Sequence, residues 1–232
     1  MLEIMSAKWR MGMLFVLCGL MIVPPTLGLE GYNEVPSNDH GDLIAYWNCD
    51  EGSGSYIYDI VAVGYYPTTT HRGELSGNAY FTDGIFYNCL GFTSSSYVSL
   101  GTSSDFKRTD DFAIEAWIKT STTGAYQAIF DGFRRVGGTV SYGYSFYVHS
   151  NNKLAVAMYT TGGSGIELKG TTIVTDGNWH YVAVRFDRPT VEIYVDGVLD
   201  ASTNWNYNID YYTTHYFHIG RRSDTEWGAF QF

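Results

Sequence analysis

The sequence is poor in charge, and especially in positive charge. Its 232 residues include 14 Lys and Arg against 24 Asp and Glu, which gives a formal net charge of −10 at pH 7. Nucleic acid binding relies on clustered Lys and Arg side chains that neutralise phosphates, and no such cluster occurs along the chain. The charge balance therefore excludes nucleic acid as a partner, and it favours solubility.

The chain also lacks a sustained apolar stripe at the 3.6-residue period of a helix. Aromatic residues make up 17% of the sequence, and its 26 glycines are spread between short runs that read as strands. Such runs, separated by turn residues, are typical of an all-β sandwich or barrel. The length suits one domain of this kind.

No apolar run reaches the ~20 residues that a membrane-spanning helix needs. The longest candidate, residues 11–23, follows Lys8 and Arg10 and ends before two prolines. A short apolar segment behind a basic start is typical of a secretory signal peptide. We therefore expect residues 1–28 to be a signal peptide that is cleaved after Gly28. An uncleaved N-terminal membrane anchor is the alternative.

Export would place the remaining chain outside the cell or at the cell surface, without a membrane span after signal cleavage. Residues 29–41 carry turn residues and little apolar character, so we expect them to form a leader. Residues 42–232 are then expected to form the single folded domain.

Cysteine is scarce, with three in the whole chain. Signal cleavage would remove Cys18 and leave Cys49 and Cys89, an even number in an oxidising compartment. A disulfide between these two would close a loop of roughly 40 residues and stabilise the fold by about 3–4 kcal/mol. Two separate buried thiols are the alternative, because free cysteine is often buried.

The clearest strand signal lies in residues 176–200, DGNWHYVAVRFDRPTVEIYVDGVLD. Apolar residues occupy alternate positions in two successive runs, which are Val182, Val184 and Phe186, then Val191, Ile193 and Val195. This period of two predicts two half-buried strands. Asp196-Gly197 then supplies the residues of a tight hairpin turn.

The residues of this segment also match a known family. The pattern D-G-x-W-H-x-V-A-V-x-F-D, followed by V-x-I-Y-V-D-G-V, resembles the central strands of the laminin G-like, concanavalin A-like lectin/glucanase family. Residues 43–54, 88–92 and 111–119 resemble further strands of that family, so the resemblance covers residues 42–232. It implies an all-β jelly-roll sandwich of two antiparallel sheets.

The end of the chain departs from the family pattern. Residues 227–232 match the start of the family's closing strand, and the sequence stops there. We therefore expect a jelly roll that lacks its closing C-terminal strand. The chain is then a fragment of a larger multidomain, glycan-active secreted protein, or a truncated module with an open sheet edge that invites pairing.

The carboxylates do not form the arrangement that glucanases of this wider fold use. Hydrolysis of a glycosidic bond needs two carboxyl groups on either side of it, and the E-x-D-x-x-E pattern that supplies them is absent. Glu115 has no second acid on its strand face, and Asp110 and Asp111 are adjacent. No G-x-S-x-G sequence surrounds a serine. We therefore expect no enzyme activity.

Binding is the function that the resemblance implies. Sugars are held by aromatic rings and by polar groups, and one turn-rich stretch combines both. The expected ligand-binding residues are Trp205, Asn206, Tyr207, Asn208, Asp210, Tyr211, Tyr212 and Tyr142. The alternative is that these tyrosines cover the rim of the sandwich with their hydroxyls in water.

We accordingly expect an exported module that recognises glycans. The alternative is an adhesion or structural module whose partner is a cell-surface protein. The resemblance also implies a calcium ion near Asp59, the position at which the family often holds one, and no other cofactor. The loop that follows Asp59 has lost the family's Ser and Asn residues, and Asp59 capping a turn is the alternative.

Overall fold

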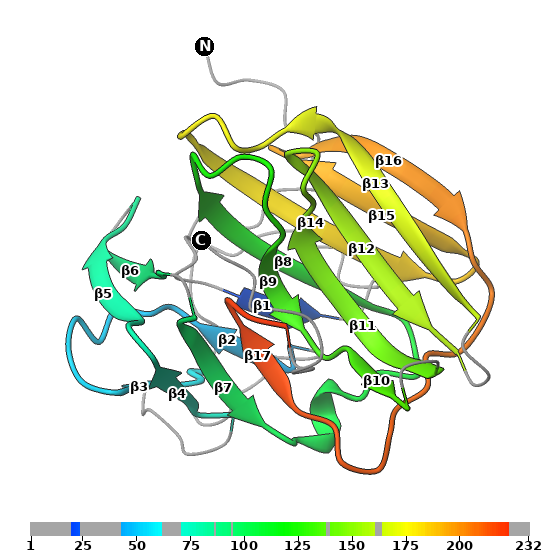
Figure 1. The fold of residues 1–232 in the computed structure, drawn as a ribbon, viewed down its shortest axis with the longest axis horizontal. Helices are drawn as coiled ribbons and strands as arrows, with labels where there is room; N and C mark the ends of the chain where they lie inside the picture. Colours follow the sequence, from blue (N-terminus) through cyan, green and yellow to red (C-terminus); the bar gives the residue numbers. More distant parts are fainter. Residues whose placement is uncertain are drawn as a thin grey trace.

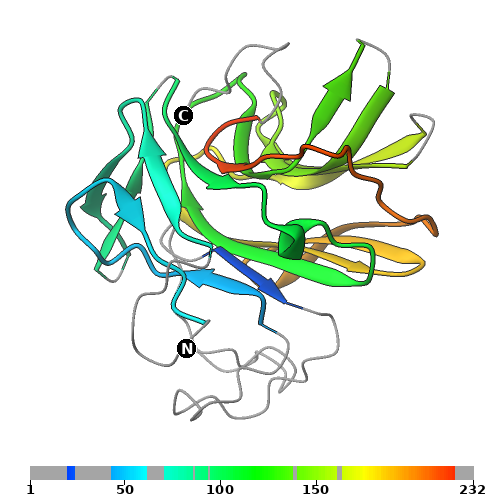
Figure 2. The same cartoon turned by 90° about the horizontal axis from the view of Figure 1, so that it is seen from below.

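The computed structural model describes residues 20–23, 43–61, 71–85, 87–93, 95–137, 140–160 and 164–222. Within these ranges almost all regular structure is β-strand, and every pair of neighbouring strands is antiparallel. Figures 1 and 2 show two large sheets that lie face to face. The structure confirms the predicted all-β sandwich of the jelly-roll class.

Over the described residues, the first layer is a six-stranded sheet. Its order is β16 (Val198–Asn204), β15 (Thr190–Val195), β14 (Trp179–Asp187), β8 (Phe112–Lys119), β1 (Leu20–Val23) and β2 (Ala45–Trp47). The long middle strands β8 and β14 pair from Phe112–Phe186 to Lys119–Trp179, so they form the rigid centre of this layer.

The second layer is a nine-stranded sheet, counted over the same described residues. Its order is β13 (Gly165–Ile173), β12 (Lys153–Tyr159), β11 (Val140–Val148), β9 (Gln127–Asp131), β17 (Phe217–Ile219), β7 (Tyr97–Gly101), β4 (Gly73–Ser76) and β3 (Tyr56–Ile57), with β10 (Arg134–Val136) paired to β11. A separate hairpin joins β5 (Tyr80–Asp83) to β6 (Asn88–Gly91), and a 3₁₀ helix covers Ser104–Phe106.

The predicted hairpin of residues 176–200 is confirmed. The two alternating runs form β14 and β15, and Asp196-Gly197 turns the chain from β15 into β16, with φ angles of 52° and 79°. Two successive positive φ angles are what a tight two-residue hairpin turn requires, and Asp-Gly adopts them at low cost.

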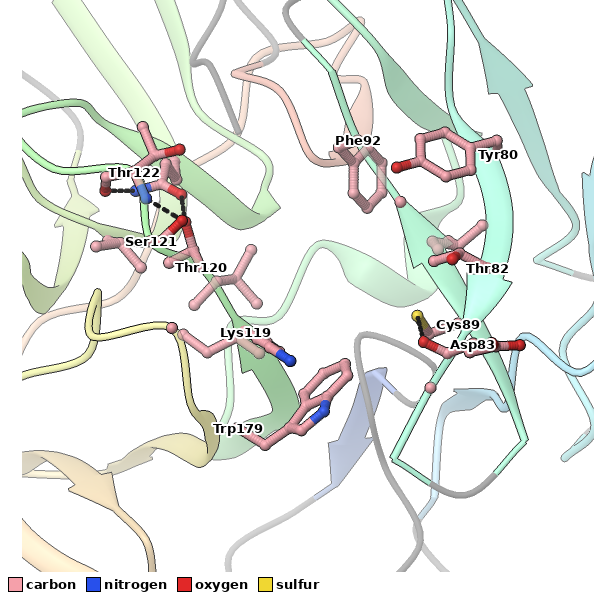
Figure 3. Close-up of a pocket in the computed structure, with 18 residues that line it drawn as sticks. Tyr80, Thr82, Asp83, Cys89, Phe92, Lys119, Thr120, Ser121, Thr122 and Trp179 are labelled. Atoms are coloured by element: carbon pink, nitrogen blue, oxygen red, sulfur yellow. Dashed lines mark hydrogen bonds between the residues drawn. The ribbon is translucent and has the colours of Figure 1, made fainter.

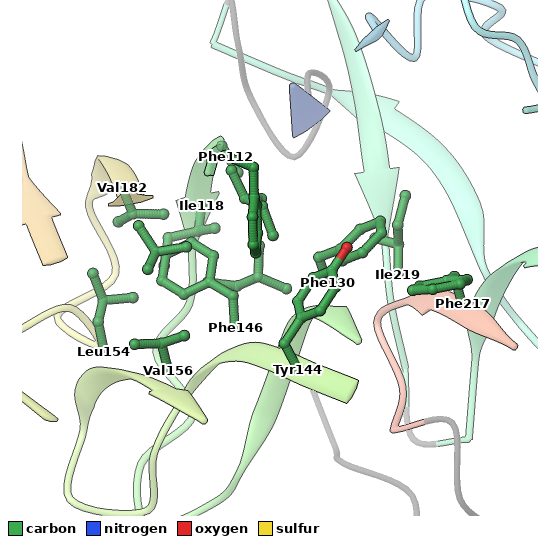
Figure 4. Close-up of a cluster of buried hydrophobic side chains, with 14 of the residues drawn as sticks. Phe112, Ile118, Phe130, Tyr144, Phe146, Leu154, Val156, Val182, Phe217 and Ile219 are labelled. Atoms are coloured by element: carbon green, nitrogen blue, oxygen red, sulfur yellow. The ribbon is translucent and has the colours of Figure 1, made fainter. Parts of the chain in front are cut away.

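The core lies between the two sheets. From β8 the alternate residues Phe112, Ile114, Ala116 and Ile118 are buried, as their period of two predicts. They meet aromatic side chains from the nine-stranded sheet, among them Phe130, Tyr144 and Phe146 (Figure 4). The Tyr144 hydroxyl donates to the Phe106 carbonyl at 2.9 Å, which satisfies its one polar group inside the core.

Strand β1 comes from the apolar run that the sequence suggests is a signal peptide. It pairs antiparallel with β2 on one side and with β8 on the other, and thereby links β2 to the rest of the six-stranded sheet. The expected cleavage site at Gly28, the leader 29–41 and the expected closing strand at 227–232 lie outside the described residues. In the part of the chain that is described, no helix is long and apolar enough to cross a bilayer.

The two described cysteines are thiols, so the expected disulfide is absent from the structure. Cys49 donates weakly to the Trp47 carbonyl at 3.9 Å, and Cys89 donates to the Asp83 carbonyl at 3.3 Å. Burial raises the pKa of the Cys49 thiol well above its usual value. Each thiol therefore has its own acceptor, which corresponds to the alternative of two separate buried thiols.

Candidate functional site

A cleft of about 630 Å³ opens between the β5–β6 hairpin and the six-stranded sheet, as Figure 3 shows. One wall comes from the end of β8, the loop at 120–122 and the start of β14. The other wall comes from the hairpin and from Phe92, which follows β6. Binding sites for small ligands usually have volumes of about 300–1,000 Å³, so this cleft is large enough for a sugar unit or two.

Lys119 and Trp179 form the first wall. They are register partners at the ends of β8 and β14, so their side chains leave the same face of the sheet. The Lys119 Nζ atom lies 5.8 Å from the centre of the Trp179 ring, within the range of a cation–π contact. Figure 3 shows both side chains directed toward the hairpin on the other side. This wall combines an aromatic surface with a positive charge.

The turn that carries Trp179 is held in place by a histidine between two aspartates. His180 Nδ1 lies 2.9 Å from the Asp196 carboxylate, and His180 Nε2 lies 3.1 Å from the Asp176 carboxylate. Burial lowers the pKa of His180, but the hydrogen bonds to Asp196 and Asp176 outweigh this and raise it overall. Hydrogen bonds from Asn178 and His180 lower the pKa of Asp176 to about 2. The charged form of His180 therefore stabilises the turn beside the cleft.

The hairpin wall presents the rings of Tyr80 and Phe92. A Cβ atom at Gly91 would lie 2.4 Å from Cζ of Tyr80, so the absence of a side chain at Gly91 lets that ring lie across the hairpin. Gly220 does the same for Phe92, since a Cβ atom there would lie 2.5 Å from Cε1 of the ring. The glycines therefore hold two aromatic rings at the mouth of the cleft (Figure 3).

The loop between β8 and β9 is fixed by a buried amide. Gln127 accepts a hydrogen bond from the Thr120 hydroxyl at 2.7 Å and donates one to the Thr122 carbonyl at 2.9 Å. Apolar side chains, including Ile118 and Ile129, form the floor beneath it. The lining of the cleft thus combines an apolar floor with polar groups around its rim, a composition that suits a ligand with apolar and polar parts.

The charges of the cleft are few. Lys119 stands on the sheet side, and Asp83 at the end of β5 is the one acidic residue among the described lining residues, with its side chain directed away from the cleft (Figure 3). Hydrolysis of a glycosidic bond needs two carboxyl groups at a defined separation. The rim hydroxyls can instead accept and donate hydrogen bonds, so the described lining is suited to holding a polar ligand.

The structure differs from the sequence-based expectation at Trp205. This side chain exposes only 7% of its surface and packs against Phe186, with ring centres 5.5 Å apart. Tyr211 is also largely enclosed, and its hydroxyl donates to the Arg108 carbonyl at 2.7 Å. Both rings are therefore used by the core, because the segment after β16 crosses from one sheet to the other at the strand ends. The Trp205 backbone N–H donates to the Pro189 carbonyl at 2.6 Å. The Asp210 backbone N–H donates to the Tyr159 carbonyl at 3.0 Å.

The other expected binding residues lie apart from the cleft. Tyr207 is 62% exposed, and Tyr212 contacts Tyr142, with ring centres 5.7 Å apart. The Asn208 side chain accepts from Arg188 at 2.6 Å. The remaining two members of the set, Asn206 and Asp210, are exposed and half-buried respectively. A binding role for the exposed members of this segment stays a prediction.

Asp59 is fully buried and its carboxylate is already engaged. One oxygen accepts from the backbone N–H groups of Tyr46 at 3.0 Å and Val61 at 2.9 Å, and the other lies 2.9 Å from His71 Nδ1. Calcium prefers six to eight oxygen ligands, whereas two N–H donors and an imidazole surround this carboxylate. These contacts do not fit a calcium ion, and they favour the alternative that Asp59 stabilises a turn.

Sequence reasoning selected neither Trp179 nor Lys119 as a binding residue. Successive residues of a strand point to opposite faces, and this alternation is the signal that could have identified both residues. Because Val182 faces the core, Trp179 at an odd position must face outward, and the same reasoning applies to Lys119 beside buried Ile118. What this alternation cannot show is that the β5–β6 hairpin stands opposite these two side chains.

A family profile described as the concanavalin A-like lectin/glucanases superfamily matches residues 92–232, more than half of the chain. No curated protein matches. Three solved structures show the same fold at low sequence identity. The binding domain of Paraclostridial Mosquitocidal Protein 1 has a TM-score of 0.55 and 13% identity, over 75% of this chain and 44% of the other. This chain therefore spans less than half of that protein's length.

The two further structures are more similar to this chain in length. Domain 4 of AbnA, a GH43 extracellular arabinanase from Geobacillus stearothermophilus in complex with arabinotriose, has a TM-score of 0.52 and 15% identity, over 75% of this chain and 81% of the other. The CBM40 of the Ruminococcus gnavus IT-sialidase has a TM-score of 0.51 and 16% identity, over 61% and 82%. At such identities the likeness establishes the fold.

Proposed function

Since this chain belongs to the concanavalin A-like lectin/glucanases superfamily, we propose that it is an exported, non-catalytic module that binds carbohydrate. A shared fold does not fix a function, so the proposal depends on the site. The observation that carries it is the cleft of about 630 Å³ in which Trp179 and Lys119 face Tyr80 and Phe92.

The chemistry of a sugar fits this lining. A pyranose ring has an apolar C–H face, which packs on an aromatic ring, and a polar edge of hydroxyl groups. Trp179 offers the ring surface, and the hydroxyl of Thr82 offers a hydrogen-bond partner on the opposite wall. Each hydrogen bond contributes about 0.5–1.5 kcal/mol, so several are needed together with stacking to hold a ligand.

Two of the structural neighbours support this proposal. Domain 4 of AbnA has arabinotriose bound, and the IT-sialidase domain is named as a CBM40. At 15% and 16% identity, the ligand of either neighbour cannot be assigned to this chain. The two neighbours make a glycan the first class of ligand to test.

The test is a glycan array with the folded protein, in calcium and again in chelator. We expect Trp179→Ala to abolish the hits while far-UV circular dichroism and cooperative unfolding show that the variant still folds, because Trp179 is a half-buried wall residue. Tyr207→Ala is the matched control, since Tyr207 is exposed outside the cleft. Loss of binding in Tyr207→Ala but not in Trp179→Ala would move the site to the originally expected segment.

Adhesion to a protein at the cell surface is the second candidate function. Three aliphatic side chains, Ile173, Val198 and Leu199, are exposed where β13 and the β15–β16 hairpin adjoin. Exposed aliphatic groups that lie together often mark a protein contact. An array without hits, together with self-association that Leu199→Glu abolishes, would favour this function over glycan binding.

A further inference from the structure

Lys119 is the cationic residue among the described residues that line the cleft, and stacking of a sugar on Trp179 does not account for its charge. Among the described residues, no carboxylate lies within salt-bridge distance of its ammonium group, although acidic side chains outnumber basic ones by 24 to 14 in the whole sequence. The ammonium group instead lies over the Trp179 ring, 5.8 Å from its centre. The ammonium is therefore available at the place where a stacked sugar would lie.

The opposite wall presents no charged side chain to the cleft. Figure 3 shows the Asp83 side chain directed away from the cleft, and its carbonyl, which accepts from the Cys89 thiol at 3.3 Å, lies on the cleft side. Lys119 is therefore the charged side chain that the described lining directs into the cleft, and it attracts a negative group on a ligand.

We propose that the cleft selects glycans whose sugar units carry an anionic group, which pairs with Lys119 while the ring stacks on Trp179. This inference rests on the proposed carbohydrate binding and names the class of sugar. The anionic group can come from a uronic acid, a sialic acid or a sulfated sugar, and these share the chemistry that an ammonium recognises. Because the protein as a whole is acidic, the attraction must be local to the cleft.

The test measures the affinity of the folded full chain for matched pairs of sugars by titration calorimetry. The pairs are oligogalacturonate against its methyl ester, sialyllactose against lactose, and a sulfated against an unsulfated galactoside. We expect at least one anionic member to bind about tenfold more tightly than its neutral partner at low salt, the size expected of a charge-assisted hydrogen bond. The preference should shrink as salt rises, because the cleft is open to solvent.

Three variants decide the role of the charge. Lys119→Gln should remove the preference and leave the affinity for neutral sugars unchanged, whereas Lys119→Arg should keep the preference. Lys153→Gln is the matched control, because Lys153 begins β12 and does not line the cleft. Lys119→Gln should fold normally, since its side chain is exposed, and circular dichroism checks this.

The outcomes separate the two proposals. Equal affinity for anionic and neutral sugars, or a preference that survives in Lys119→Gln, overturns the anionic selection and leaves carbohydrate binding intact. Absence of binding to every sugar, charged or neutral, overturns both. A preference lost equally in Lys153→Gln would mean that overall charge, rather than the cleft, attracts the ligand, and it also overturns this inference.

Discussion

Trp179 and Trp205 differ in what surrounds their rings, and this difference assigns them different roles. Trp179 stands at the start of β14, where the sheet ends and the cleft begins. Trp205 follows β16 and packs on Phe186 inside the sandwich. Trp179 is thus a candidate surface for stacking a sugar, whereas Trp205 is part of the core.

Replacement of Trp205 should therefore affect stability rather than binding. Trp205→Ala removes a core ring that is only 7% exposed, and we expect a loss of about 3–5 kcal/mol in the free energy of unfolding. Tyr207→Ala at its exposed neighbour should change this free energy by less than about 0.5 kcal/mol. Urea denaturation of both variants measures the difference. Equal, small losses would contradict the assignment of Trp205 to the core.

One histidine, His180, joins two turns of the six-stranded sheet. His180 connects the turn before β14 to the hairpin turn between β15 and β16 through Asp176 and Asp196. The pKa of His180 is raised by these partners. Its charged form therefore stabilises the folded state.

The sign of the resulting pH dependence follows from linkage. The contribution of His180 is fully present below the ordinary histidine pKa of about 6.5, and it is lost as pH rises through the higher pKa of the folded protein. We expect the stability difference between the wild type and His180→Gln to be largest at mildly acidic pH and to shrink in alkali. Thermal denaturation of both proteins across this range measures it. A difference that grows with pH would refute the role of the charged histidine.

The elements of the six-stranded sheet depend on β1 for their continuity. β1 lies between β8 and β2, so its removal would leave one edge of β8 and one of β2 without a partner. Unpaired edges lose backbone hydrogen bonds and invite association with other chains. The predicted signal cleavage would remove this strand.

A comparison of the full chain with residues 29–232 tests this dependence. We expect the shorter chain to unfold at a lower temperature and to associate at high concentration, because β8 and β2 lose the strand between them. Calorimetry and light scattering measure the two effects, and N-terminal sequencing of the exported protein shows whether cleavage occurs. Equal unfolding temperatures would show that β1 contributes little to the fold.

Two buried histidines, His215 and His218, have pKa values shifted in the opposite direction to that of His180, and they affect the stability of the whole molecule. Burial lowers the pKa of both His215 and His218 to about 4. His215 makes a short contact with the Gly132 carbonyl, and the nearby cations Lys107 and Arg134 lower its pKa further. Neutral imidazoles are therefore built into the nine-stranded sheet and its neighbourhood.

These histidines should make the protein sensitive to acid. Their contribution to stability is present above the ordinary pKa of about 6.5 and declines as pH falls from there toward 4, because the unfolded chain takes up protons first. We expect the free energy of unfolding to fall in this interval. His218→Gln should flatten the decline, and urea denaturation at a series of pH values measures both. A stability that stays constant between pH 6.5 and 4 would contradict this expectation.

Much of the fold could be predicted from local residues. The alternation in β15 shows which side chains are buried, that in β8 and β14 shows which side chains face the core, and Asp196-Gly197 marks the hairpin turn, because strand geometry and turn geometry depend on near neighbours. The site could be predicted only in part. The density of tyrosines at 205–212 suggested a binding surface, but the burial of Trp205 depends on Phe186, a residue that is distant in sequence.

The sequence by itself determined the antiparallel strands, their core faces and the family, since each follows from short-range patterns of residues. Tertiary structure alone decided where a ligand could bind, because the cleft requires the β5–β6 hairpin to stand opposite Lys119 and Trp179. It also decided that Cys49 and Cys89 have separate acceptors and that Asp59 pairs with His71. These outcomes depend on distances between residues far apart in the chain, and only the packing of the sheets sets those distances.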